Sequence, residues 1–200
     1  SVLSGTDTLA LMPTGGGKSI TFQVPALARP GIGLVISPLV ALMKDQVSHL
    51  LRRGIRAALI SSEMSRSEIL QQLENCILGD YKFLYISPER ISSDLFQSKL
   101  TALKHKVNLL VVDEAHCISQ WGNDFRRDYR LIADIRDVIP EVPVIAVTAS
   151  ATAAVVADIC EQLHFRKGYQ VFHAAFERPN LTFVVRKTDN KLAEICHILQ

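Results

Sequence analysis

The sequence predicts a three-layer α/β domain built on a parallel sheet. Short apolar runs recur along the 200 residues, and amphipathic stretches separate them. Strands that are apolar on both faces are typical of a parallel sheet covered by helices on both sides. The length suits one domain with a real core and is too short for two large lobes.

Six apolar runs are the predicted strands, and each is followed by a turn signal. They are Thr8–Leu11, Gly33–Ile36, Ala57–Ile60, Phe83–Ile86, Leu109–Val112 and Val144–Val147. Between them, apolar residues recur three and four apart, as in Ile69, Leu70, Leu73 and Ile77, which is the spacing of an amphipathic helix. Right-handed crossovers between the strands then place helices on both faces of the sheet.

Composition limits the classes of function. With 22 Lys and Arg against 20 Asp and Glu, the net charge of +2 neither requires nor excludes a polyanionic partner. The four cysteines are far apart, which indicates reduced thiols and no disulfide or zinc framework. The longest uncharged stretch, Val142–Ala157, contains polar residues and is shorter than a membrane span. We therefore expect a soluble intracellular protein, in the cytoplasm or nucleoid, with no membrane partner.

Polar residues gather directly after the predicted strands. These clusters are Pro13–Ser19, Ser37–Pro38, Ser61–Ser62, Ser87–Glu89, Asp113–His116 and Thr148–Ser150. In a parallel sheet such loops share the edge formed by the carboxyl ends of the strands, where ligands of open α/β sheets bind. Loops are commonly polar, but that does not explain a Lys, an Asp and a Glu at the same edge.

The first cluster predicts a phosphate-binding loop. The run Thr14-Gly15-Gly16-Gly17-Lys18-Ser19 lies between a strand and a helical pattern. Glycines let backbone N–H groups turn toward an anion, and the following helix adds its positive end. Lys18 would reach the β- and γ-phosphates of ATP, and the Ser19 hydroxyl would bind Mg²⁺. Met12 stands where the pattern has its first glycine.

The second half of this site is predicted at Asp113 and Glu114. Asp113 ends an apolar strand, where a carboxylate holds Mg²⁺ directly or through water, and Glu114 is placed to polarise a water for attack on the γ-phosphate. Alone, two acids at a strand end are more often solvated. A GTPase would need an Asn-Lys-x-Asp motif that is missing here, whereas a small-molecule kinase stays open on these two motifs.

Five segments carry a resemblance to one family. They are Met12–Ser19, Ser37–Val47, Tyr85–Arg90, Asp113–Gly122 and Phe176–Leu181. In this order they resemble the first RecA-like lobe of a RecQ-family DNA helicase, in the DExH group of superfamily 2. The resemblance covers essentially the whole chain and implies a RecA-like P-loop NTPase fold. It also implies that the parent protein is an ATP-dependent helicase that moves 3′ to 5′ on DNA in repair or recombination.

The resemblance implies roles for single residues. Lys18 and Ser19 match the contacts to the triphosphate and Mg²⁺, and Asp113 and Glu114 match the Mg²⁺ carboxylate and the catalytic base. His116, Thr148 and Ser150 resemble the family's elements that couple ATP hydrolysis to movement of the two lobes. Without the resemblance, a polar residue that starts a helix explains His116 equally well.

The segment from Cys117 to Tyr129 resembles a loop through which RecQ proteins sense single-stranded DNA. Trp121, Phe125 and Tyr129 are four residues apart, a spacing that by itself favours one buried helical face. In an exposed loop the rings would instead stack on bases, with Arg126, Arg127 and Arg130 meeting phosphates. The resemblance favours this stacking role for Trp121 and Phe125 only, and Tyr129 is left as packing. The family often has His where this chain has Asn123, so a ring contact is lost there.

Ser37 and Lys44 resemble part of the surface that follows the DNA backbone, although ordinary turn and capping chemistry explains such residues equally well.

The segment Phe176–Leu181 interrupts the rhythm of strands and helices. We expect the lobe to comprise residues 1–178, and residues 179–200 to be an exit strand or linker that begins a second lobe. The resemblance implies that an adenine-reading segment, the second lobe with its γ-phosphate arginine, and any zinc site lie outside these residues. The isolated chain should then bind ATP and Mg²⁺ weakly. A superfamily 2 translocase, an RNA-directed helicase or a nucleotide switch remain alternatives.

Overall fold

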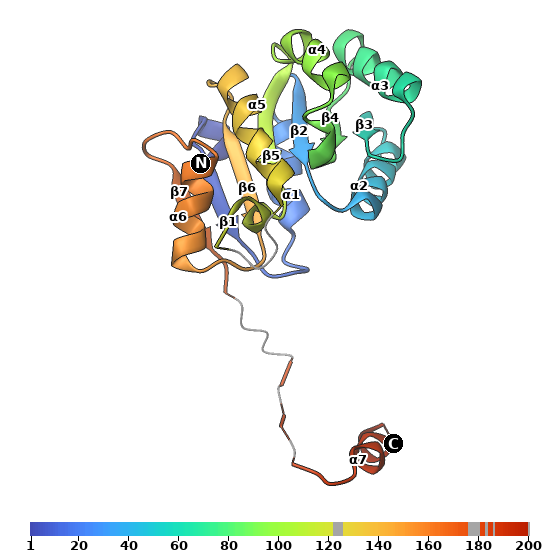
Figure 1. The fold of residues 1–200 in the computed structure, drawn as a ribbon, viewed down its shortest axis with the longest axis vertical. Coiled ribbons are helices and arrows are strands. Elements are labelled where there is room, and N and C mark those ends of the chain that lie inside the picture. Colours follow the sequence, from blue (N-terminus) through green and yellow to red (C-terminus); the bar gives the residue numbers. More distant parts are fainter. Residues whose placement is uncertain (122–125, 176–180, 183, 186, 200) are drawn as a thin grey trace.

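The structure is a computed structural model that describes residues 1–121, 126–175, 181–182, 184–185 and 187–199. Its centre is a seven-stranded sheet in the order β3-β4-β2-β5-β6-β1-β7, with every neighbouring pair parallel. Helices cover both faces of this sheet (Figure 1). The predicted three-layer α/β fold is therefore confirmed.

The six predicted strands are all present, with small extensions, and a seventh was missed. Their bounds are β1 Thr8–Leu11, β2 Ile32–Ile36, β3 Ala57–Ile60, β4 Phe83–Ile86, β5 Val107–Val112 and β6 Val144–Thr148. The additional strand, β7 (Gln170–His173), pairs with β1 at the edge of the sheet. Its side chains are mostly exposed, so it lacks the apolar run that identifies the other strands.

Alternate residues of the strands point to two apolar layers. On one face, Val35, Val111 and Val147 pack with Phe22 and Met43 of the helices α1 and α2. On the other face the remaining strand residues pack against four helices. The helices of the body are α1 Lys18–Leu27, α2 Val40–Arg52, α3 Arg66–Leu78, α4 Asp94–Leu103, α5 Ile132–Val138 and α6 Ala153–Gln162. Short 3₁₀ turns are η1 Val2–Ser4, η2 Pro88–Arg90, η3 Ala115–Ile118 and η4 Arg127–Leu131.

The strand order brings distant loops together at the carboxyl edge. Strand β6 lies between β5 and β1, so the loop after β6 separates the loops after the other two. On the other side of β5 lies β2, and Asp113 N–H donates to the carbonyl of Ile36 at 2.9 Å. Segments that are about a hundred residues apart thus become neighbours.

The opposite edge of the sheet holds a buried charge cluster around Asp7. Asp7 precedes β1 and is 1% exposed. Arg136 Nη2 lies 3.0 Å from its Oδ2, and Arg166 Nη2 lies 2.9 Å from its Oδ1. Backbone N–H groups of Val144 and Arg166 donate to the same carboxylate at 2.9 and 2.8 Å. This cluster ties β1, β6, α5 and the turn after α6 together.

The C-terminal segment contains one further described helix, α7 (Lys191–Ile198), which buries none of its residues. The predicted boundary at residue 178 falls outside the described residues, so it stays a prediction. Within the described ranges, every helix is too short or too polar to cross a membrane.

Candidate active site

The loop between β1 and α1 adopts the backbone that an anion cradle requires. Gly15 and Gly17 have φ angles of 80° and 82°, values that side chains other than glycine rarely adopt. A Cβ atom on Gly16 would lie 2.9 Å from the carbonyl oxygen of Pro13, so this position also excludes a side chain. Gly17 caps α1, and in the described chain no side chain caps this helix end. The first N–H groups of α1 are therefore open to a ligand.

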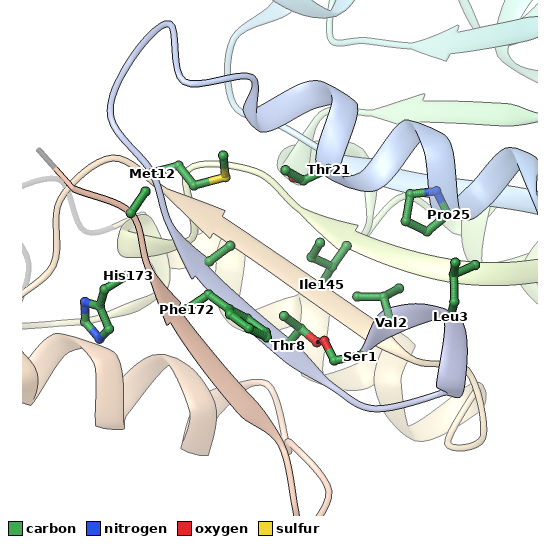
Figure 2. A pocket seen from close by; sticks show the side chains of 12 residues that line it. Ser1, Val2, Leu3, Thr8, Met12, Thr21, Pro25, Ile145, Phe172 and His173 are labelled. Carbon is green, nitrogen blue, oxygen red and sulfur yellow. Dashed lines mark hydrogen bonds between the residues drawn. The ribbon is translucent and has the colours of Figure 1, made fainter.

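Met12 departs from the glycine pattern for a structural reason. Figure 2 shows its side chain at an apolar cavity of about 410 Å³, with Thr21 and Pro25 of α1 and Phe172 of β7 around it. The described residues that line this cavity include no lysine, arginine or carboxylate, so the lining does not suit a triphosphate. The N–H of Met12 donates to the carbonyl of Thr148 at 2.9 Å. Met12 therefore packs away from the cradle.

The cradle and the acidic pair meet across β6. Lys18 Nζ lies 3.0 Å from Glu114 Oε1, although 96 positions separate the two residues. Their side chains are 15% and 20% exposed, so the pair lies in a partly open recess. The predicted meeting of the two motifs is confirmed.

Asp113 is held from three sides. Its Oδ2 accepts the Ser37 hydroxyl at 3.1 Å, and its Oδ1 accepts the Glu114 N–H at 3.0 Å. Tyr129 donates its hydroxyl to the Asp113 carbonyl oxygen at 2.9 Å. The side chain is thus fixed in orientation, and the residue is only 4% exposed.

The environment of Asp113 leaves its negative charge poorly compensated. Burial and then the charge of Glu114 raise the pKa of this carboxyl. Hydrogen bonds from Ser37 and the Glu114 N–H, and the charge of Lys18, oppose that change without overcoming it. A cation bound beside Asp113 would therefore stabilise the ionised form.

Glu114 has a strained backbone. Its φ of 47° lies in the left-handed region, which is unusual for a residue with a long side chain. The N–H of Cys117 donates to its carbonyl at 2.9 Å and holds this conformation. Such strain is concentrated at functional sites, and here it accompanies the contact between the carboxylate and Lys18.

His116 connects this acid to the loop after β6. Its Nδ1 lies 2.8 Å from Thr148 Oγ1 and 3.4 Å from Glu114 Oε2. The hydroxyl of Thr148 also donates to the carbonyl of Ser150 at 3.3 Å. The three predicted coupling residues therefore form one connected group with the acidic pair.

The predicted DNA-binding residues divide into three groups. Trp121 is 78% exposed, whereas Phe125 and Asn123 lie outside the described residues. Lys44 is exposed on α2 and forms an ion pair with Glu63. Ser37 is 1% exposed and its hydroxyl donates to Asp113, so the structure gives this hydroxyl a partner inside the protein, and a part of Ser37 in the DNA surface stays a prediction.

Arg126 and Tyr129 close the segment that contains Trp121. The N–H of Arg126 donates to the carbonyl of Cys117 at 2.9 Å, and the Arg126 side chain is half-buried. Tyr129 is fully buried, which confirms its prediction as packing. Its hydrogen bond to Asp113 was not predicted, because the sequence does not indicate which strand end a buried ring will face.

The residues present fit a nucleotide with its cation. Lys18 and the open N–H groups of α1 suit phosphate oxygens. Ser19 and Asp113 supply the hard oxygen atoms that Mg²⁺ prefers, and Mg²⁺ is commonly held by one or two carboxylates together with phosphates. The described residues contain no cluster of three or more His, Cys, Asp or Glu side chains suited to a metal ion.

Residues 1–159 match the sequence profile of the DEAD/DEAH box helicase family. The chain belongs to this family. A solved structure bears out the fold: the helicase domain of Pyrococcus furiosus Hef superposes with a TM-score of 0.68 over 89% of this chain and 36% of that chain. The two are 23% identical, so this likeness concerns the fold alone.

Curated DEAD/DEAH relatives confirm the resemblance to RecQ sequences. The ATP-dependent DNA helicase RecQ of Bacillus subtilis is 50% identical over 186 residues, which are 92% of this chain and 31% of that protein. The ATP-dependent helicase SGS1 of Saccharomyces cerevisiae is 42% identical over 205 residues, or 98% of this chain and 14% of that protein. The chain thus spans about a third or less of the length of these relatives.

Proposed function

We propose that this chain is the ATP-binding lobe of a DNA helicase that moves 3′ to 5′ and unwinds duplex DNA. The observation that carries the proposal is the 3.0 Å contact between Lys18 Nζ and Glu114 Oε1, which puts a phosphate-binding loop and a candidate catalytic base at one recess. The helicase names of its curated relatives support DNA as the substrate. Because its proposed substrate is DNA, we place the protein where DNA is found inside the cell, in the cytoplasm or nucleoid.

The recess assigns a task to each of its residues. The N–H groups at Gly17–Ser19 and the amine of Lys18 would hold the β- and γ-phosphates. Asp113 and the Ser19 hydroxyl would hold Mg²⁺, which when bound neutralises charge that develops on the phosphate oxygens. Ser37 keeps the Asp113 carboxylate in the required orientation through its hydrogen bond.

The ion pair between Lys18 and Glu114 supports an order of events. Phosphate oxygens compete with Glu114 for the Lys18 amine, and the carboxylate is then free to accept the proton of an attacking water. His116 lies 3.4 Å from the other oxygen of Glu114 and contacts Thr148. A movement of the Glu114 carboxylate away from Lys18 would therefore shift His116 and, through it, Thr148. In this way the position of the Glu114 carboxylate would couple ATP hydrolysis to the loop after β6.

DNA contact is assigned to the surface around Trp121. An exposed indole is a stacking platform for bases, and stacking tolerates any sequence. Arg126, Phe125 and Lys44 are the further predicted contacts. A second RecA-like lobe would complete the nucleotide site, so the 200 residues alone should bind ATP and Mg²⁺ weakly and hydrolyse ATP poorly.

The test is strand separation and ATP hydrolysis by the full-length protein on a 3′-tailed duplex. Lys18→Ala should lower kcat/KM for ATP about 10²- to 10³-fold, because it removes the charge that meets the developing phosphate charge. Glu114→Gln should retain ATP binding and lose hydrolysis, since the amide cannot accept a proton. Lys104→Ala, which changes a lysine at the end of α4, is the matched control and should behave as wild type.

Two results would contradict the proposal. One is an ATPase that single strands do not stimulate, and the other is full activity after Lys18→Ala. Matched DNA and RNA duplexes distinguish a DNA helicase from an RNA-directed one, because only the latter unwinds the RNA duplex preferentially.

A further inference from the structure

Two side-chain bridges join the segment after the acidic pair to the segment after β6. The first is the contact of His116 with Thr148 described above. The second lies farther along both segments, where the hydroxyl of Ser119 donates to Asp158 Oδ2 at 2.5 Å. Asp158 belongs to α6, which begins at Ala153 after the N-cap Thr152 and packs against η3. The second bridge has no part in the proposed chemistry.

The second bridge is short and sheltered. Ser119 is completely buried, so its hydroxyl is shielded from competing water. A hydrogen bond from a hydroxyl to a carboxylate is stronger than one between two neutral groups. The other oxygen of Asp158 accepts from Gln162 Nε2 at 3.3 Å, one turn later in the same helix. Asp158 is therefore oriented by its own helix while it holds Ser119.

Ser119 passes this restraint to the exposed indole. Its Oγ accepts the backbone N–H of Trp121 at 3.2 Å, so one hydroxyl connects the α6 carboxylate with the turn that carries Trp121. The indole itself is 78% exposed, so among the described residues little packs against it. The position of the ring therefore depends on its backbone, which depends on Ser119.

We propose that Asp158 is a positioning residue that holds Trp121 in its solvent-facing place through Ser119, and that it thereby connects a base-stacking surface with the Thr148–Ser150 turn. The proposal deepens the proposed function and rests on it for the role of DNA. Displacement of Trp121 by a base would move Ser119 and hence α6, whose N-cap Thr152 lies two residues after Ser150.

The local part of the proposal is tested without DNA or ATP. Trp121 is the sole tryptophan of the 200 residues, so time-resolved fluorescence anisotropy of this chain reports its motion directly. Asp158→Ala and Ser119→Ala should both increase the fast, local component of the decay, while the slow component of overall tumbling stays constant. Asp158→Asn keeps an acceptor oxygen and should restore wild-type behaviour. Glu161→Ala changes an exposed side chain of the same helix and is the matched control.

The coupling part is tested with the full-length protein. Asp158→Ala should raise about ten-fold the oligo(dT) concentration that half-maximally stimulates ATP hydrolysis. The DNA-free rate should stay at the wild-type value, and Asp158→Asn should restore the DNA response. A purely structural role would instead lower the DNA-free rate and the thermal midpoint together.

The outcomes separate the two proposals. Wild-type anisotropy in Asp158→Ala overturns the positioning role, whatever DNA does. A wild-type protein that DNA does not stimulate overturns the proposed function, and the anisotropy still decides whether Asp158 positions Trp121. Altered anisotropy with an unchanged DNA response overturns the connection to the nucleotide site.

Discussion

Two buried aspartates lie at opposite edges of the same sheet, and they differ in how far neighbouring groups compensate their negative charges. Asp7 and Asp113 are 1% and 4% exposed. Two arginines and two backbone N–H groups surround Asp7. Asp113 receives one hydroxyl and one backbone N–H, and its acidic neighbour Glu114 takes the contact with Lys18.

The pKa directions express this difference. Burial by itself raises the pKa of Asp7, but the hydrogen bonds from Arg166 and Val144 and the charge of Arg136 outweigh it, and the pKa lies below its ordinary value. Burial and the charge of Glu114 raise the pKa of Asp113. A buried carboxylate that the protein neutralises itself has a structural role, and one left under-compensated is suited to an external cation.

The largest effect should come from removal of the compensated carboxylate. Asp7→Ala leaves Arg136 buried without its partner, which should lower the free energy of unfolding by about 3–5 kcal/mol. Urea unfolding of the 200-residue chain measures this loss. Asp137→Ala is the control, since the exposed pair of Asp137 with His164 should contribute less than about 1 kcal/mol. Equal midpoints for the Asp7 variant and wild type would show that the cluster is not structural.

The under-compensated carboxylate should respond in the opposite sense. Asp113→Asn removes a buried charge that the fold does not balance, so the free energy of unfolding should stay level or rise. Affinity for a fluorescent ATP analogue in the presence of Mg²⁺ should fall by at least about 100-fold, because a metal ligand is lost. The exposed Asp134→Asn on α5 is the control. Mg²⁺-dependent binding that survives Asp113→Asn would remove this residue from the cation site.

A smaller effect is expected at Ser37. Ser37→Ala removes the hydroxyl that orients Asp113, and loss of such a supporting contact should lower Mg²⁺-dependent nucleotide affinity about ten-fold. Affinity for single-stranded DNA should not change, because the hydroxyl is buried. Ser98→Ala, at an exposed serine of α4, provides the comparison. A selective loss of DNA binding in Ser37→Ala would instead support the predicted part of Ser37 in the DNA-binding surface.

The smallest effect is a difference in the pH dependence of stability. For Asp7 the folded pKa lies below the ordinary value of 3.8, so its contribution is present above that value and is lost as pH falls through the folded pKa. For Asp113 the folded pKa lies above 3.8, so stability falls as pH rises from 3.8 through the folded pKa. Urea unfolding at several pH values should show that Asp113→Asn removes the second trend and keeps the first. Identical pH profiles for this variant and wild type would contradict the assignment.

Local pattern was sufficient for most of the fold and for the two main motifs. Apolar runs predicted six strands, because a strand buried on both faces needs no partner to be recognised. The glycines of the cradle and the Asp-Glu pair after β5 were likewise legible, since their chemistry depends on neighbours in the chain. Strand β7 was missed because its side chains are mostly exposed, so its pairing with β1 is the main evidence that it is a strand.

Which loops lie next to one another could be read only from the three-dimensional structure. The local pattern showed that Ser37 and Asp113 each follow a strand and that Thr148 lies where another strand ends. It did not determine that β2 would lie beside β5 and bring the Ser37 hydroxyl to the Asp113 carboxylate. Nor did it determine that Ser119 would meet Asp158. The physical reason is that strand order depends on packing across the whole sheet, whereas periodicity and motif spacing record only what each segment buries or binds locally.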